Sequence, residues 1–323
     1  MPNQRFRTKI RQLKEQAILR VKQEFGAILC EFIKRTFKMW ERFGLHLTMN
    51  HYYEPVPDTR KLKDTLWQVP SKLVGLDMND PLQLNLLSRF VAKYKQEYDR
   101  FPIDKPELSH VFYLTNPAIP VVDGEILYCM IRDVKPRKII EIGSGYSTYL
   151  SAQALLQNQE DDPLHACELI AIEPYPNQVL QKGFPGFSRL IQKPVQEVPL
   201  AEFESLNEGD ILFIDSSHIL KIGSDVQYEY LEILPRLKRG VFVHIHDIHF
   251  PFEYPKGLVL QSRRFWNEQY LRQAFLAFND CFQILWASHY MLMHHSEILA
   301  AAFDRSFHLP NCWPSSCWIR RVR

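Results

Sequence analysis

Two short segments combine carboxylates with imidazoles at spacings that suit a reaction centre. The first contains Asp215 and His218, and the second contains the adjacent pair His246 and Asp247. Each segment directly follows an apolar run that is typical of a buried strand. Carboxylates are preferred ligands of Mg²⁺, whereas an imidazole shifts the preference toward Mn²⁺ or Fe²⁺. An imidazole with its ordinary pKa of ~6.5 can also take a proton near neutral pH.

Two hypotheses fit these residues. In the first, Asp215 and Asp247, joined by His246, bind Mg²⁺ or Mn²⁺. The cation would orient a substrate hydroxyl and lower its pKa, and His218 would take the proton as general base. In the second, no metal binds, and His218 or His246 alone is the base. Both require the two strands to be neighbours in a parallel sheet, so that the side chains converge at its carboxyl edge.

A glycine turn follows an earlier β-branched run at residues 138–142. The turn reads Glu141-Ile142-Gly143-Ser144-Gly145-Tyr146-Ser147-Thr148. Gly143 and Gly145 allow a sharp turn and let a ligand approach the backbone closely. A third glycine, as in dinucleotide-binding turns, is missing, and the turn has no Lys or Arg for a pyrophosphate. The turn therefore suits a nucleotide-like ligand without phosphates.

Glu173 ends the next apolar run, residues 169–172, about one βαβ unit after the glycine turn. A carboxylate at this position can accept hydrogen bonds from both hydroxyls of a ribose. The alternative is a solvent-facing cap before the turn Pro174-Tyr175-Pro176. The preceding glycine turn favours ribose binding.

The elements that must position these residues alternate between strands and helices. Strands are predicted at 138–142, 169–172, 189–192, 210–214, 240–245, 282–288 and 317–322, and helices at 5–43, 82–100, 124–134, 147–157, 228–237 and 296–303. Such alternation predicts an α/β fold with a doubly wound parallel sheet. The last two strands are expected to form an antiparallel pair at its edge.

At the glycine turn and the two acidic segments, the chain resembles the class I S-adenosylmethionine (SAM)-dependent methyltransferases. Asp215-x-x-His218, followed by a strand ending in an acidic residue, is similar to small-molecule O-methyltransferases of the macrolide-sugar and cephalosporin-hydroxylase-like type. The resemblance implies a Rossmann-like, seven-stranded sheet with an antiparallel edge strand. It implies a methyltransferase domain over residues 109–323, preceded by a helical extension over residues 1–108.

The same resemblance implies roles for individual residues. It gives SAM as cofactor, bound by Glu141, Gly143, Ser144, Gly145, Tyr146, Ser147, Glu173, Gln196 and Asp215. It gives Asp215 and Asp247 as ligands of Mg²⁺ or Mn²⁺, and His218 as base. His246 stands where the subgroup tends to have a carboxylate. The implied reaction is O-methylation of a small-molecule or glycoside hydroxyl.

The composition of the chain limits which kinds of partner and cellular location are expected. The chain has 323 residues and a net charge of +2, which gives no indication of nucleic-acid binding. Its six cysteines include no C-x-x-C pair, which favours a cytoplasmic protein with reduced thiols. The basic amphipathic helix at 5–43 is expected to pack on its own domain or in a homo-oligomer, and a membrane surface is the less favoured alternative. Two other functions stay open: a non-catalytic interaction module with the SAM-binding fold, and an NAD(P)-dependent oxidoreductase.

Overall fold

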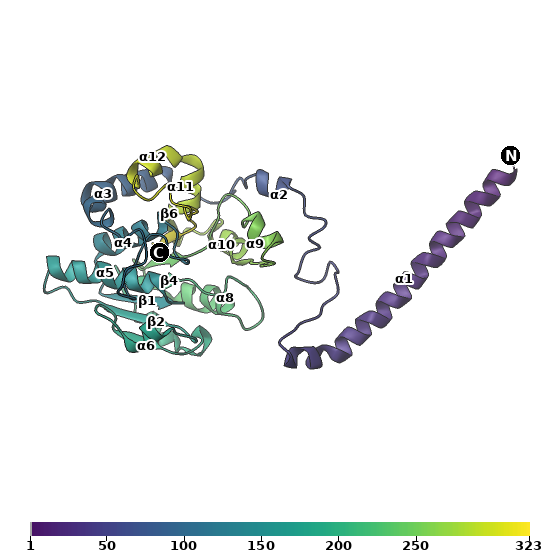
Figure 1. Cartoon of the computed structure of the whole chain (residues 1–323), viewed down its shortest axis with the longest axis horizontal. Coiled ribbons are helices and arrows are strands. Elements are labelled where there is room, and N and C mark those ends of the chain that lie inside the picture. Colours follow the sequence, from purple (N-terminus) through teal and green to yellow (C-terminus); the bar gives the residue numbers. More distant parts are fainter. Residues whose placement is uncertain (1) are drawn as a thin grey trace. The chain divides into compact units, whose positions relative to one another are not determined.

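The centre of the fold is a sheet with helices on both sides (Figure 1). Its seven strands have the order β3-β2-β1-β4-β5-β7-β6. In this computed structural model, which describes residues 2–323 and the side chains of 14–16 and 25–323, the chain divides into a unit of residues 1–63 and a unit of residues 64–323. The strands are β1 (Lys138–Ile142), β2 (Glu168–Ile172), β3 (Arg189–Ile191), β4 (Ile211–Ile214), β5 (Phe242–Ile245), β6 (Phe282–Ala287) and β7 (Cys317–Arg321). All seven lie in the second unit.

The parallel strands end in register. Ile142 of β1 lies beside Ile172 of β2 and Ile214 of β4, and Ile214 lies beside Ile245 of β5. β7 runs antiparallel to both β5 and β6 and lies between them. The residues that follow β1, β2, β4 and β5 therefore meet at one edge of the sheet.

Helices cover the sheet on both faces because successive strand residues point to opposite sides. The helices of this unit are α2 (Thr65–Gln68), α3 (Asp80–Tyr98), α4 (Asp123–Val134), α5 (Tyr146–Asp161), α6 (Gln178–Lys182), η1 (Val195–Glu197), α7 (Leu200–Glu204), α8 (Asp225–Tyr228), η2 (Glu229–Ile233), η3 (Leu234–Arg236), α9 (Lys256–Leu260), α10 (Glu268–Leu276), α11 (Ser288–His294) and α12 (Ser296–Ala302). Ile139 of β1 belongs to the core cluster with α3, α4, α5 and α12, whereas Ile140 belongs to the cluster with η2 and α10. The sheet is therefore packed between two apolar layers, one on each face.

The predicted fold class is confirmed, and every predicted strand is present to within two residues of its bounds. The segment predicted as a helix over 228–237 is helical, but it changes type, from the end of α8 to the π-helical η2 and then to the 3₁₀ turn η3. Pro235 has no N–H to continue an α-helical ladder, which is consistent with the change of helix type.

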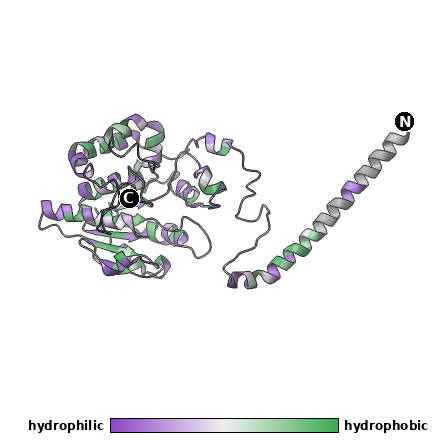
Figure 2. Ribbon diagram, in the orientation of Figure 1, coloured by the Kyte–Doolittle hydropathy of each residue, from purple (hydrophilic) through white to green (hydrophobic). Residues whose placement is uncertain are grey.

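The first unit contains α1 (Pro2–Arg42), close to the predicted 5–43. Figure 2 shows hydrophobic residues recurring between hydrophilic ones along its C-terminal part. In the part of the chain that the structure describes, every helix is too short or too polar to cross a membrane. The domain bounds 1–108 and 109–323 stay a prediction, as do the partner of α1 and the cellular location.

Candidate active site

Backbone hydrogen bonds fix the residues that follow the strands. The N–H of Gly143 donates to the carbonyl of Ile172 at 3.0 Å, and the N–H of Asp215 donates to the carbonyl of Ile142 at 2.9 Å. The N–H of His246 donates to the carbonyl of Ile214 at 3.0 Å. The ladder therefore continues one residue beyond the strands and holds the start of each active segment.

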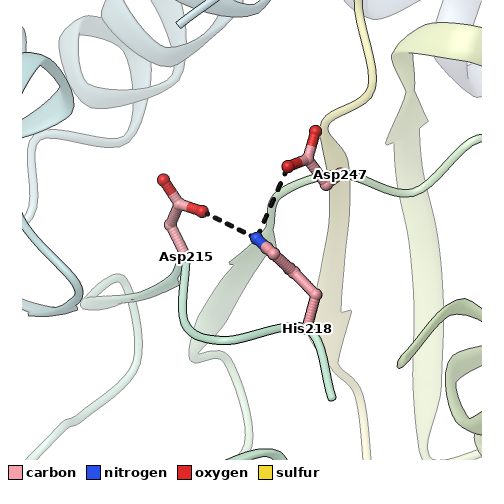
Figure 3. Close-up of side chains that lie close together, drawn as sticks. All are labelled: Asp215, His218 and Asp247. Atoms are coloured by element: carbon pink, nitrogen blue, oxygen red, sulfur yellow. Dashed lines mark ion pairs between the residues drawn. The ribbon is translucent and has the colours of Figure 1, made fainter. Parts of the chain in front are cut away.

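Asp215, His218 and Asp247 form a compact cluster at this edge (Figure 3). Nε2 of His218 lies 3.3 Å from Oδ1 of Asp215 and 3.4 Å from Oδ2 of Asp247. One ligating atom of each residue lies within 4.8 Å of the others. The three side chains thus point toward a common centre from the segments after β4 and β5.

Two residues of this cluster have left-handed backbone conformations. His218 has φ of 59° and Asp247 has φ of 56°, a left-handed region that is uncommon for any residue except glycine, although asparagine, aspartate and histidine adopt it more often than the rest. Such conformations persist only when the surrounding structure imposes them, and they are common at functional sites. The backbone therefore turns sharply at the points where these side chains enter the cluster.

The other side of His218 is held by α10. Its Nδ1 lies 2.9 Å from Oε2 of Glu268, whose second oxygen accepts a hydrogen bond from the hydroxyl of Tyr230 at 3.1 Å. The ring of Trp266 lies 4.5 Å from the imidazole, centroid to centroid. The carbonyl of His218 also accepts from the N–H of Asn267 at 3.1 Å. These contacts fix the orientation of the imidazole.

Electrostatics at the cluster favour ionised forms. Burial alone would lower the pKa of His218, but its hydrogen bonds to Asp215 and Glu268 outweigh burial and raise the pKa well above its ordinary value. Burial would raise the pKa of Asp215, but the imidazoles of His246 and His218 lower it to about 2. The cluster therefore carries opposite charges at neutral pH.

His246 lies behind this cluster rather than in it. Among the described residues, the group whose ligating atoms converge comprises Asp215, His218 and Asp247. His246 is buried, and its Nδ1 has no hydrogen-bond partner. Burial lowers its pKa, but Asp215, Asp247 and Asp123 together raise it above the ordinary value.

Asp247 has a second support that the sequence did not indicate. The hydroxyl of Ser315 donates to Oδ1 of Asp247 at 3.0 Å, and the N–H of Ser315 donates to the buried Asp123 at 2.7 Å. Asp123 and Glu268 were both missed, because neither stands at an informative spacing from the segments it supports.

A pocket of about 330 Å³ lies beside the cluster. Its lining includes four predicted cofactor residues, Gly143, Glu173, Gln196 and Asp215. Oε2 of Glu173 accepts from the N–H of Ser144 at 3.3 Å. Gly143 has φ of +77°, and a Cβ there would lie 1.9 Å from the carbonyl oxygen of Asp215. Only glycine fits this approach of the turn to the strand beside it.

Five further predicted cofactor residues, Glu141, Ser144, Gly145, Tyr146 and Ser147, lie in the turn outside this lining. The hydroxyl of Ser147 donates to Oε1 of the buried Glu141, whose Oε2 has no partner. Burial raises the pKa of Glu141 to about 8. Tyr146 packs edge-to-face against Tyr113, at 5.5 Å between centroids.

Residues 140–248, which contain the glycine turn and both acidic segments, match a family model described as a methyltransferase domain. This match identifies residues 140–248 as a methyltransferase domain. An uncharacterized protein of Archaeoglobus fulgidus is 29% identical over 168 residues, which is 50% of this chain and 74% of that protein.

Solved structures similar to this methyltransferase include the apo form of CmcI-N160, with 15% identity, a TM-score of 0.36, and coverage of 71% of this chain and 84% of that one. CalS11, a TDP-rhamnose 3'-O-methyltransferase of calicheamicin biosynthesis, has 12% identity, a TM-score of 0.38, and coverage of 76% and 95%. An O-methyltransferase from Bacillus cereus in complex with S-adenosylhomocysteine (SAH) has 12% identity, a TM-score of 0.35, and coverage of 74% and 91%.

Proposed function

We propose that this methyltransferase transfers the methyl group of SAM to an oxygen, the hydroxyl of a small molecule or a glycoside. The observation that carries the proposal is the position of Nε2 of His218, 3.3 Å and 3.4 Å from the carboxylates of Asp215 and Asp247. Asp215 also lines the pocket at the glycine turn. The group that handles the proton therefore adjoins the space that suits the methyl donor.

The residues of the pocket fit SAM. Glu173 lies at the end of β2 with its carboxylate in the lining, where it can accept from the ribose hydroxyls. Glu141 is buried with an unpartnered oxygen, and a cationic amine is the partner that such a carboxylate lacks. Gly143 lets the turn lie directly against the backbone of Asp215, since a Cβ there would be 1.9 Å from the carbonyl oxygen of Asp215. When bound, SAM supplies an electrophilic methyl group on its sulfonium.

The carboxylates of the cluster also fit a divalent cation. Asp215 and Asp247 would hold it, while Nε2 of His218, which lies between their carboxylates, stays available as the base. Two carboxylates completed by water suit Mg²⁺ or Mn²⁺. When bound, the ion would supply positive charge that orients the acceptor hydroxyl and lowers its pKa.

The side chains of the cluster would position the acceptor and take its proton. Glu268 holds Nδ1 of His218 and thereby orients the imidazole. Its carboxylate contacts favour the protonated imidazole in the free protein, so Nε2 must first release that proton to solvent before it can take the proton of the acceptor. Asp215 lines the cofactor pocket and contacts His218, so it aligns the two reactants. Alignment of this kind can contribute ~7–11 kcal/mol to the lowering of the barrier.

The test begins with the purified chain and a thermal-shift titration with SAM, SAH and NAD⁺. Ligand at a hundredfold its Kd stabilises by ~2.7 kcal/mol, which shifts Tm by several degrees. A shift with SAM and SAH alone is expected, and a shift with NAD⁺ alone would refute the proposal. Binding of Mn²⁺, followed by its electron paramagnetic resonance signal, should be lost in Asp247→Asn and kept in Asp280→Asn, an exposed control.

Turnover is measured with methyl-labelled SAM and a panel of phenols and glycosides. The product should be an O-methyl ether, and His218→Gln should abolish its formation while SAH still binds. Cofactor binding without transfer to any hydroxyl in the panel would favour the interaction module instead.

A further inference from the structure

A second pocket, of about 270 Å³, opens beyond the cluster. Its lining includes Trp67, His249, Phe252, His289, Met293 and Trp313. These residues come from α2, from the segment after β5, from α11, and from the segment that leads into β7. Three large aromatic side chains and two imidazoles therefore face one small space.

The pocket adjoins the cluster along two segments of chain. His249 stands two residues after Asp247, and Trp313 stands two residues before Ser315, whose hydroxyl binds Asp247. A series of ring contacts joins the same two places. His218 contacts Trp266 at 4.5 Å, Trp266 contacts Tyr254 at 5.9 Å, and Tyr254 contacts His249 at 5.6 Å, centroid to centroid.

The walls suit a planar ring. His289 packs against Trp313 at 5.4 Å and against His249 at 5.4 Å between centroids. Trp67 is held by a hydrogen bond from its Nε1 to the carbonyl of Tyr254 at 2.9 Å. Aromatic side chains favour offset-stacked or edge-to-face contacts with another ring. The fixed indole thus presents a ready surface for a flat ligand.

The charged groups of this pocket already have partners. Glu253 accepts from the hydroxyl of Tyr270 at 2.7 Å, and Lys256 pairs with Asp64 at 2.8 Å. Burial lowers the pKa of His289 to about 4, so this imidazole is uncharged at neutral pH. An uncharged ligand therefore fits the pocket better than an ionised one.

Few polar atoms in the lining of this pocket are free to bind a ligand. Nδ1 of His249 and Nδ1 of His289 are buried and have no partner in the described structure. A glycoside carries hydroxyls around its whole rim, which need carboxylate or amide partners. The lining offers one carboxylate, whose Oε1 already accepts from Tyr270, one ammonium, which pairs with Asp64, and two imidazole nitrogens. These few free hydrogen-bonding atoms match a ring with one or two polar substituents.

We propose that this pocket binds a planar, uncharged aromatic ring of the methyl acceptor, whose phenolic hydroxyl extends to the Asp215–His218–Asp247 cluster. The inference rests on the proposed function and narrows its acceptor from hydroxyls in general to phenols. In the transfer, the phenolic oxygen bonds to the methyl carbon while the carbon–sulfur bond breaks. The electron pair of that bond stays on sulfur, giving SAH, and the phenolic proton goes to Nε2 of His218, which must have released its own proton to solvent beforehand.

The test uses the full chain saturated with SAH and three probes in saturation-transfer NMR titrations. The probes are 2-naphthol, decahydro-2-naphthol, which has the same carbon skeleton without the planar ring, and methyl α-glucoside. We expect 2-naphthol to bind most tightly. Trp313→Ala should raise its Kd about tenfold, because one ring contact and its buried area are lost.

Control substitutions test whether a change in the Kd of 2-naphthol comes from this pocket or from the rest of the protein. Trp313 is 52% exposed, so its replacement should leave folding and SAH affinity unchanged. His289→Leu should weaken 2-naphthol less than Trp313→Ala does, and Phe278→Ala, an exposed aromatic outside this lining, should have no effect.

The inference is overturned if the Kd of 2-naphthol is the same in Trp313→Ala, or if either non-planar probe binds as tightly. If SAH binds but 2-naphthol does not, this inference alone fails. If SAH itself does not bind, the proposed function fails and the inference with it.

Discussion

Cofactor affinity should rise with pH up to about 8, because Glu141 must lose a proton to face the ammonium of SAM. Glu141 is 1% exposed, and one of its oxygens lacks a partner. Burial raises its pKa from 4.5 to about 8, so the free protein holds this carboxyl protonated at pH 7. A bound ammonium favours the ionised form, so binding releases the proton.

The magnitude follows from the difference between pH and pKa. At pH 7, one unit below a pKa of about 8, ionising the carboxyl costs about 1.4 kcal/mol, which is about tenfold in Kd. The Kd of SAM should therefore fall about tenfold per pH unit as the pH rises toward 8, and then level off. The free protein behaves in the opposite sense. Because the folded pKa exceeds the unfolded one, this carboxyl's contribution to stability is lost as the pH rises through about 8.

Calorimetric titrations with SAH, which has the same ammonium, between about pH 6 and 8.5 measure this linkage directly. Titrations in buffers of different ionisation enthalpy report the number of protons released, and we expect close to one at pH 7. Glu141→Gln keeps an acceptor for the hydroxyl of Ser147 and should remove the pH dependence. Methylthioadenosine, which lacks the amino-acid part, is the matched ligand. A pH-independent Kd for SAH in the wild type, or an unchanged slope in Glu141→Gln, would refute the reasoning.

Three other substitutions test the framework of the site. Gly143→Ala should lower the free energy of unfolding, measured in urea, by at least ~2 kcal/mol, because φ is +77° and the new Cβ would meet the carbonyl of Asp215. Gly145→Ala is the control, since its Cβ meets no atom within 4 Å, and it should lower that free energy by less than half as much. Glu268→Ala leaves two buried polar groups, Nδ1 of His218 and the hydroxyl of Tyr230, without their partner, so the free energy of unfolding should fall by ~2–3 kcal/mol and Glu268→Gln should recover part of it. Ser315→Ala removes the hydrogen bond that orients Asp247 and should weaken Mn²⁺ binding about tenfold with little change in Tm; equal Mn²⁺ affinity in this variant would show that the hydroxyl has no such role.

The fold could be predicted because its signals are local. Most strands are predominantly apolar runs bounded by turn residues, four to six residues long except for the three-residue β3, and parallel strands place their carboxyl ends together. That rule predicted that Asp215, His218, His246 and Asp247 lie near one another; in the structure the ligating atoms of Asp215, His218 and Asp247 converge, and His246 is not part of that group. The pattern also did not predict the helix type at 228–237, where Pro235 lies within an otherwise helical pattern.

The site's supporting contacts could not be predicted, since they join segments far apart in sequence. Glu268 lies 50 residues from His218, and Ser315 lies 68 residues from Asp247. No periodicity links such pairs, and only the packing of α10 and of the segment before β7 brings them together. A buried carboxylate partner is therefore visible only in the folded chain.

Which imidazole joins the two aspartates depends on the backbone rather than on residue type. His246 directly follows β5 and is held by the sheet ladder, so its side chain continues the strand's alternation into the buried layer beside Asp123. Asp247 and His218 leave that alternation, because both have positive φ. The left-handed turn brings Nε2 of His218 between the two carboxylates and turns Nδ1 toward Glu268. A sequence pattern carries no signal for a positive φ at a histidine, since that conformation is imposed by the packing around it. The same packing makes His218, rather than His246, the imidazole that lies between the two carboxylates at this edge.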